Sequence, residues 1–305
     1  MAKPKSVLVR VPATTANLGP GFDCLGLALD IWNEIEFSIS RNSLKIEIEG
    51  EGSNTLPRDD SNLIYQCMQT LSRIASQSLP DGIRIKCGNN IPVSSGLGSS
   101  SAAVIAGLLG AKNLLNLQIS DHELLKTALS FEGHADNISA CLFGGLTITA
   151  LSAGELVVKK LAIKPLNAVI ALPNVNLSTR QARAVLPETL SMKDAVFNIG
   201  RAALLINALQ DSNYDLMKIA MEDRLHQPYR LGLIPGTEAA ISEALEAGAL
   251  GAALSGAGPG VIAFIEKGDK KVGETMVRVF KNANMAALLF TTTTTNQSAQ
   301  VIMKA

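Results

Sequence analysis

The chain has 305 residues, 47% of them hydrophobic and 18% charged, which is enough apolar sequence for two domains or one large one. Lys plus Arg and Asp plus Glu number 27 each, so there is no basic excess to attract nucleic acid or an anionic membrane, and a small-molecule partner is favoured. Residues 1–5 lack the apolar core of a signal peptide and the four cysteines are scattered, so we expect a cytoplasmic protein with reduced, buried thiols and no structural zinc.

The first strand is expected at residues 7–11, which are mostly β-branched. A long stretch of small residues and turn formers follows at residues 12–26 and is expected to be a loop. Long loops in compact domains are often functional, and a plain surface connection is the alternative. Residues 34–39 and 44–48 alternate apolar and polar side chains, which predicts half-buried antiparallel strands joined by a turn near residues 42–43.

Two helices and a strand are expected next. The first helix covers residues 63–74, with Asn62 at its N-cap position. A strand at residues 82–87 follows, and a further helix covers residues 123–129, with Asp121 as its candidate cap.

The most informative stretch is the glycine- and serine-rich turn at residues 90–103. Gly96 and Gly98 allow backbone conformations that a side chain blocks, and the serines at 99–101 are suited to capping the helix that follows. The free amides and the positive end of such a helix attract an anion, which predicts a phosphate-binding loop. An ordinary helix start behind a flexible turn is the alternative. A Walker loop is excluded, because no lysine follows Gly98 until Lys112.

A second polar cluster contains Glu132, His134, Asp136 and Asn137 within six residues, which is too polar for a core segment. A capping or surface turn is one interpretation. The other is a metal site at Glu132, since Mg²⁺ is bound through one or two carboxylates together with substrate phosphates.

The pattern loosens around residues 160–167, and we place a domain boundary near residue 165. The expected elements beyond it are a strand at 168–172, a short helix from 179 stopped by Pro187, helices at 195–208 and 216–225, two strands around a glycine turn within 251–264, and a terminal strand at 291–295. This order predicts an α+β sandwich. The uncharged run at 247–265 is not a membrane span, because it contains five glycines and Pro259.

The densest polar and aromatic cluster of the second half is Asp-Arg-Leu-His-Gln-Pro-Tyr-Arg at residues 223–230. Its composition suits a polar ligand. A helix C-terminus, whose cations favour the helix dipole, is the alternative.

Several motifs resemble those of a known family. Pro-x-x-x-Gly-Leu-Gly-Ser-Ser at residues 92–100 is similar to the ATP-phosphate motif of the GHMP kinases, and residues 251–264 are similar to their third motif. The sequences of residues 12–23, 132–137 and 223–230 resemble motifs of the homoserine kinases within that family. Arg183 lies in a segment similar to their Ser-Thr-x-x-Ala-Arg-x-x-Leu-Pro.

The resemblance implies the two-domain α+β fold of the GHMP kinases. Residues 1–165 would form an ATP-binding domain like domain 2 of ribosomal protein S5, and residues 166–305 a ferredoxin-like C-terminal domain, with the active site between them. It also implies an ATP-dependent kinase that uses Mg²⁺ and converts L-homoserine into O-phospho-L-homoserine on the route to threonine, usually as a homodimer.

The resemblance further implies an ATP site with an asparagine facing the adenine, a loop around the phosphates and a metal. Glu132, with Ser99 or Ser100, would hold the Mg²⁺. The residues implied around ATP are Asn62, Pro92, Val93, Ser94, Ser95, Gly96, Leu97, Gly98, Ser99, Ser100, Ser101 and Ala102.

An amino-acid substrate carries two fixed charges that need partners once water is excluded. Arg183 and Arg230 are implied for its carboxylate through bidentate contacts, and Asp23 with Asn17 for its ammonium group. The pocket would be completed by His134, Asn137 and Thr179.

Glu132, Asp136 and Asn137 are implied at the catalytic centre. In many relatives an aspartate of the Gly-x-Asp segment acts as general base together with a lysine near the chain start. Asp136 is present here, but neutral residues at 14–16 replace the lysine. Base catalysis by Asp136 and transfer without a protein base both stay open, because a loose phosphoryl-transfer transition state demands little early deprotonation.

Two alternatives remain at the level of function. Another GHMP kinase, for mevalonate or shikimate, would keep the phosphate loop but have no use for both an ammonium partner and a carboxylate clamp. A non-catalytic sensor or an RNA-binding relative is the other, and the neutral net charge speaks against the latter.

Overall fold

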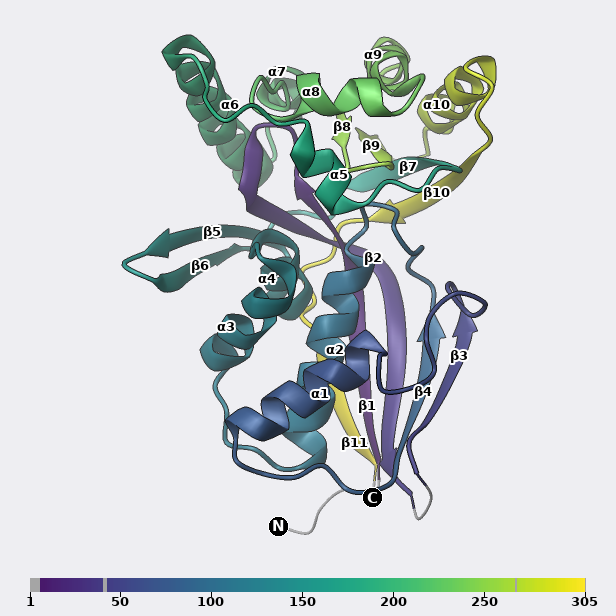
Figure 1. The fold of residues 1–305 in the computed structure, drawn as a ribbon. Helices are drawn as coiled ribbons and strands as arrows, with labels where there is room; N and C mark the ends of the chain where they lie inside the picture. Colours follow the sequence, from purple (N-terminus) through teal and green to yellow (C-terminus); the bar gives the residue numbers. More distant parts are fainter. Residues whose placement is uncertain (1–5, 41–42, 267, 305) are drawn as a thin grey trace.

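The chain is arranged as two β-sheets with helices packed against each, as the computed structural model shows (Figure 1). The structure describes residues 6–40, 43–266 and 268–304. Residues 1–5 and part of the predicted turn at 42–43 lie outside this description.

The first sheet has seven strands in the order β11-β1-β2-β4-β3, with the β5–β6 hairpin attached to β2. Its strands are β1 (Ser6–Asn17), β2 (Gly21–Ile39), β3 (Lys45–Gly50), β4 (Ile83–Asn89), β5 (Leu146–Ser152), β6 (Glu155–Leu161) and β11 (Gln300–Lys304). The antiparallel β1–β2 register shifts after Pro12 and after Ala16. Beyond these shifts the tip of the β1–β2 hairpin reaches the helices of the second sheet (Figure 1).

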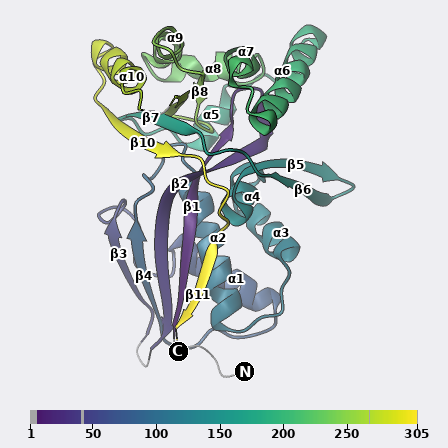
Figure 2. The ribbon, with the colours of Figure 1, turned by 180° about the vertical axis from the view of Figure 1, so that it is seen from behind.

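Four helices cover one face of the first sheet, while Figure 2 shows the opposite face from behind. They are α1 (Leu63–Ile74), α2 (Ser99–Leu114), α3 (Asp121–Glu132) and α4 (Asp136–Phe143). Helix α2 is buried on nearly all sides, because it lies between the sheet and the other helices. Its N-terminus is therefore fixed in place by the core of the domain.

The second sheet has four strands in the order β10-β7-β9-β8. They are β7 (Asn167–Pro173), β8 (Gly251–Leu254), β9 (Val261–Ile265) and β10 (Ala287–Thr293), against which α9 (Thr237–Glu246) and α10 (Lys271–Asn282) pack. The shorter and peripheral elements are α5 (Thr179–Ala184), α6 (Met192–Asp211), η1 (Tyr214–Leu216), α7 (Met217–Ala220), α8 (Gln227–Arg230) and η2 (Leu231–Leu233). Within the described ranges, none of the helices is long and apolar enough to cross a bilayer.

Several predicted elements are confirmed. Helix α1 covers residues 63–74 as expected, and Asn62 caps it through its side chain, which accepts a hydrogen bond from the Ile64 amide. The short helix from residue 179, the long helix around 195–208 and the strand pair within 251–264 are also present. The four cysteines are free, and three of them are buried while Cys24 is partly exposed.

Other expectations are wrong. Residues 12–26 are two strands around a tight turn, not a long loop. The strand β3 is not antiparallel to β2 but parallel to β4, a pairing made possible by the crossover through α1. Ser120, not Asp121, caps α3, in a capping box with Glu123.

The helix expected at residues 216–225 ends at Ala220. Asp223 explains the early stop, because its carboxylate accepts hydrogen bonds from the backbone amides of Leu225, His226 and Gln227. Those bonds compete with the helical ones.

Candidate active site

A cavity of about 550 Å³ lies where the N-terminus of α2, the β1–β2 hairpin and the elements around the second sheet meet. All of the residues predicted for substrate binding and catalysis line it: Asn17, Asp23, Glu132, His134, Asp136, Asn137, Thr179, Arg183 and Arg230. From the predicted ATP set it is lined by Asn62, Val93, Ser94, Ser95, Gly96, Gly98, Ser99, Ser100 and Ser101. Pro92, Leu97 and Ala102 are buried and do not line it.

Every second residue of the phosphate loop from Ser94 to Gly98 has a positive φ: 53° at Ser94, 80° at Gly96 and 68° at Gly98. Gly98 is the N-cap residue of α2, and no side chain caps the helix. The expectation that the serines at 99–101 cap it is therefore wrong, because they lie inside its first turn. The uncapped amides of this 16-residue helix instead face the cavity, where they and the helix dipole favour an anion.

Gly98 is required by a close approach of the first strand. A Cβ at this position would lie 1.9 Å from Oγ1 of Thr14 and 3.2 Å from Oδ1 of Asn137. Thr14 Oγ1 donates a hydrogen bond to that Asn137 oxygen at 2.7 Å. The loop, β1 and α4 are thus tied together at one point of the cavity wall.

The third motif lies directly beside the phosphate loop. Ser255 Oγ donates to the Gly96 carbonyl at 2.7 Å, and the Gly260 amide donates to the Ser95 carbonyl at 3.1 Å. A Cβ at Gly96 would lie 2.2 Å from the Ser255 carbonyl oxygen. The second sheet therefore holds the loop in its conformation.

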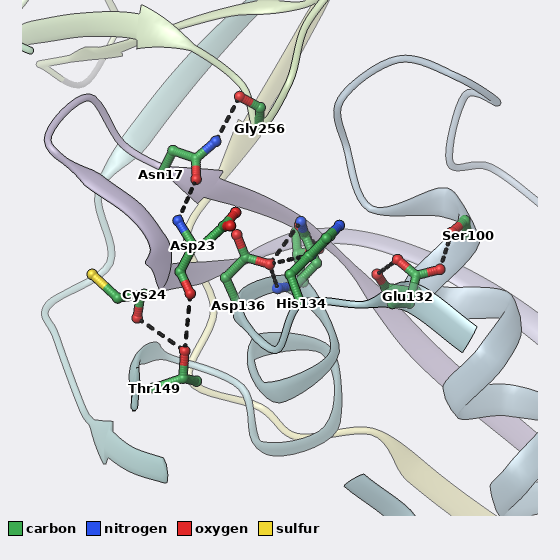
Figure 3. Close-up of polar contacts among 12 residues, drawn as sticks. Asn17, Asp23, Cys24, Ser100, Glu132, His134, Asp136, Thr149 and Gly256 are labelled. Atoms are coloured by element: carbon green, nitrogen blue, oxygen red, sulfur yellow. Dashed lines mark hydrogen bonds and ion pairs between the residues drawn. The ribbon is translucent and has the colours of Figure 1, made fainter. Parts of the chain in front are cut away.

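Glu132 is the last residue of α3, and its carboxylate faces the first turn of α2 (Figure 3). Ser100 Oγ donates to Oε1 and Ser101 Oγ donates to Oε2, the latter at 2.8 Å. One carboxylate and one hydroxyl are hard oxygen donors, which fit Mg²⁺ shared with a bound phosphate chain. Across the described residues, no group of three or more His, Cys, Asp or Glu side chains could hold a metal alone.

His134, which is partly buried, and the buried Asp136 form a pair beside Glu132 (Figure 3). His134 Nδ1 lies 2.7 Å from Asp136 Oδ1, which also accepts the Asn137 amide at 2.7 Å. Burial works against the charged imidazole, but the hydrogen bond and negative charge of Asp136 outweigh it and raise the pKa of His134. Asp136 is the first residue of α4, but the N-cap is Ala135 and no side chain caps this helix, so the capping interpretation of this segment is wrong for Asp136.

Asp23 and Arg183, predicted to bind opposite ends of an amino acid, bind one another here. Arg183 Nη2 donates to Oδ1 at 2.6 Å and Nη1 to Oδ2 at 3.0 Å. The hydrogen bond with Asp23 raises the pKa of Arg183, against the opposing effect of burial. Arg183 is presented by α5, whose start is fixed by a capping box between Ser178 and Gln181.

All three predicted amide side chains already have protein partners, and that of Asn137 is Thr14, through the bond described above. Asn17 Nδ2 donates to the Gly256 carbonyl at 2.8 Å, while its Oδ1 accepts the Asp23 amide at 3.0 Å (Figure 3). Asn62 donates to the Pro57 carbonyl at 2.7 Å in addition to its capping bond. Asn17 therefore joins Asp23 to the third motif.

Arg230 is 2% exposed and lies on the short helix α8. Its Nε donates to the Ala182 carbonyl at 3.0 Å, and its Nη1 lies 3.1 Å from Nδ1 of His226. Burial, followed by the charge of Arg183, lowers the pKa of Arg230 to about 10. The guanidinium still carries its charge at neutral pH.

One end of the cavity is apolar and was missed by sequence reasoning. It is lined by Ile35, Ile48, Leu56, Pro57, Leu63 and Cys87, together with Val93 of the predicted ATP set. Ile35, Ile48 and Cys87 have the alternating pattern of ordinary core strands, while Leu56, Pro57 and Leu63 lie in a loop and at the start of α1. Nothing in the sequence distinguishes these residues from ordinary apolar ones. Beside Asn62, this end suits the flat apolar face of a nucleobase.

The sequence matches two family models, the GHMP kinases N terminal domain over residues 62–145 and the GHMP kinases C terminal over residues 205–282. It is 41% identical over 297 residues to a homoserine kinase of Moorella thermoacetica, which covers 97% of this chain and 99% of that one. A homoserine kinase of Carboxydothermus hydrogenoformans is 39% identical, with 92% of each chain covered.

Among solved structures, the crystal structure of homoserine kinase from Cytophaga hutchinsonii superposes with a TM-score of 0.86 at 31% identity over 99% of both chains. A mevalonate kinase from L. major, at 18% identity and a TM-score of 0.68, shares the fold. The predicted two-domain α+β fold is thereby confirmed. With near-complete coverage at this level of identity, the chain belongs to the GHMP kinase family, among its homoserine kinases.

Proposed function

We propose that this protein transfers the γ-phosphoryl group of ATP to the side-chain hydroxyl of L-homoserine, giving O-phospho-L-homoserine on the route to threonine. One observation carries the proposal: a single cavity joins an uncapped helix N-terminus to a pair of opposite charges suited to an amino acid. The similarity to homoserine kinases over nearly the whole chain points to the same reaction.

ATP would lie along the first-domain side of the cavity. The apolar end beside Asn62 would take the adenine, and the amides at the start of α2 would take the phosphates. Glu132 and Ser100 would hold Mg²⁺, which supplies charge neutralisation on the phosphate chain when it is bound.

L-Homoserine would enter by exchanging partners with the Asp23–Arg183 pair. The two side chains are 35% and 37% exposed, so their mutual attraction is worth only about 1 kcal/mol. A zwitterion supplies a new partner for each, its ammonium for Asp23 and its carboxylate for Arg183. A ligand with only one charge leaves the other side chain unpaired in a desolvated site. This exchange would select amino acids over simple alcohols.

Arg230 would provide the second contact to the substrate carboxylate, from the buried side of the pocket. His134, Asn137 and Thr179 would close the pocket around the reacting hydroxyl. Asp136 already accepts two hydrogen bonds through Oδ1, so we propose that it orients His134 and Asn137, and that the hydroxyl proton leaves without a protein base.

The test is an ADP-release assay with L-homoserine, mevalonate, shikimate and 4-hydroxybutyrate as acceptors. L-Homoserine should be preferred by a large factor, and chelation of Mg²⁺ by EDTA should abolish turnover. A preference for any of the other three acceptors would overturn the assignment. Absence of acceptor-dependent turnover would favour a non-catalytic sensor or RNA-binding relative.

We also propose that residues 1–165 and 166–305 are the ATP-binding and C-terminal domains, and that the protein forms a homodimer. The two family models lie on either side of residue 165, which supports the boundary, although β11 joins the first sheet. Light scattering after size exclusion would give twice the chain mass of 32.1 kDa for a dimer.

A further inference from the structure

We infer that His226 is a positioning residue for Arg230: a neutral imidazole, with its proton fixed on Nε2, that aims the guanidinium at the substrate carboxylate. The inference rests on the proposed function, because it takes Arg230 as the carboxylate ligand. It concerns a residue that lines no part of the cavity itself.

The two ring nitrogens of His226 have partners that allow only one tautomer. The ring is fully buried, with Nε2 2.8 Å from the Gly19 carbonyl oxygen and Nδ1 3.1 Å from Nη1 of Arg230. A carbonyl only accepts and a guanidinium only donates. The proton must therefore lie on Nε2, and Nδ1 must accept from Arg230.

A charged imidazole paired with Asp223 is the competing interpretation, since Nε2 lies 3.5 Å from Oδ2 of that residue. The carboxylate of Asp223 is already saturated by four shorter hydrogen bonds, of 2.6 to 2.9 Å. Their donors are Asn198 Nδ2 and the backbone amides of Leu225, His226 and Gln227. Burial also lowers the pKa of His226, and the charge of Arg230 acts in the same direction against the attraction of Asp223.

These bonds fix the plane of the Arg230 guanidinium. Nε is bound to the Ala182 carbonyl and Nη1 to His226, so two of its three nitrogens are anchored. The Phe22 ring lies 5.2 Å from Arg230 Cζ and stacks on the His226 ring at a centroid distance of 5.2 Å. Among the described residues, Nη2 has no hydrogen-bond partner, and it is the nitrogen left for a ligand.

Two variants separate positioning from a merely structural role. His226→Asn keeps an acceptor where Nδ1 stands, whereas His226→Gln keeps a donor where Nε2 stands and loses the acceptor. His226→Gln should raise the KM for L-homoserine by about tenfold or more, as expected for a lost hydrogen bond to a charged group. His226→Asn should stay within about threefold of wild type. The KM for ATP should change in neither.

The control is His122→Gln, the same substitution at an exposed histidine outside the site, which should leave all constants unchanged. In an Arg230→Gln background, His226→Gln should add no further rise in the KM for L-homoserine, because no guanidinium is left to aim. Equal effects of His226→Asn and His226→Gln in folded proteins, or additive effects with Arg230→Gln, would overturn the inference.

The tautomer can be measured without any variant of His226. The chain has three histidines, so a long-range ¹H–¹⁵N spectrum of the wild-type protein contains three imidazoles, which His122→Gln and His134→Gln variants assign. His226 should show the neutral Nε2–H form at pH 7, and an imidazolium or an Nδ1–H form would refute the inference. A wild-type enzyme inactive on L-homoserine would instead contradict the proposed function and leave this readout standing.

Discussion

Replacing each of the two arginines of the pocket should show that a buried charge partner contributes more to L-homoserine binding than a partly exposed one. We compare Arg230→Gln with Arg183→Gln, since glutamine keeps a polar side chain of moderate length in each place. Arg230 is 2% exposed, whereas the Arg183 side chain is 37% exposed and already paired with Asp23. If both contact the substrate carboxylate, the loss at the buried position should be larger.

The expected magnitudes follow from burial. Truncating a fully buried charge partner costs about 2–5 kcal/mol, or about 30-fold to several-thousand-fold in kcat/KM for L-homoserine. At the partly exposed Arg183, solvent screening reduces the loss to about 1–2 kcal/mol, or about 5- to 30-fold. Removing Arg183 also frees Asp23 to bind the ammonium without first breaking an ion pair, which moderates its effect further.

The assay is steady-state kinetics for each variant, with both substrates varied and with thermal unfolding as the check on folding. Most of the loss should be in the KM for L-homoserine, and the KM for ATP should stay close to wild type. Equal losses at the two positions, a larger loss for Arg183→Gln, or a parallel rise in the KM for ATP would refute this division of the pocket.

Four further outcomes are expected. Gly98→Val should raise the KM for ATP by about tenfold or more, because a side chain at a φ of 68° costs about 1–2 kcal/mol before its steric overlap is counted. The control is Gly200→Val, at a position with open space around it. An unchanged affinity for ATP in a folded Gly98→Val variant would exclude this loop as the phosphate site. Glu132→Gln should lower kcat by about 100-fold, with a smaller change in the KM for L-homoserine. If the variant keeps a kcat near that of wild type and added Mg²⁺ does not change it, Glu132 is not the metal ligand. Asp136→Asn should cost much less than the general-base range of about 10²- to 10⁴-fold, and a loss within that range would restore the base to Asp136. Because the pKa of His134 is raised, its pairing with Asp136 stabilises the fold fully below the ordinary pKa of about 6.5, and this stabilisation is lost as the pH rises through the raised pKa. The free energies of unfolding of wild type and His134→Gln, measured with denaturant, should therefore converge at high pH. A difference that grows with pH would show that the pKa is shifted in the opposite direction.

Local chemistry predicted the elements whose causes are local. Helix α1 was bounded correctly because Asn62 supplies a cap and apolar residues recur at helical spacing behind it. The phosphate loop was located because glycines at 96 and 98 and the serines after them occur together. These signals depend only on neighbouring residues in the chain.

The features that could not be predicted from the sequence depend on packing between segments that are distant in the chain. The small residues at 12–26 look like loop residues, but they are small because other segments approach them closely: a Cβ at Gly26 would lie 2.1 Å from the Asp136 carbonyl oxygen. The parallel partner of β3 could not be chosen from its alternation, which is the same for either pairing. The Asp23–Arg183 bond joins residues 160 positions apart, and no local pattern shows that they meet.

The placement of β11 has a consequence for how the protein is made. It pairs with β1 along the edge of the first sheet, although the whole of the second sheet lies between these strands in the chain. During synthesis, β1 has no hydrogen-bonding partner on this side until the ribosome has completed residues 300–304. A nascent or truncated chain that lacks β11 would expose an unpaired, strand-forming edge, which is a template for aggregation. A short deletion at this strand should therefore reduce soluble yield far more than its five residues suggest.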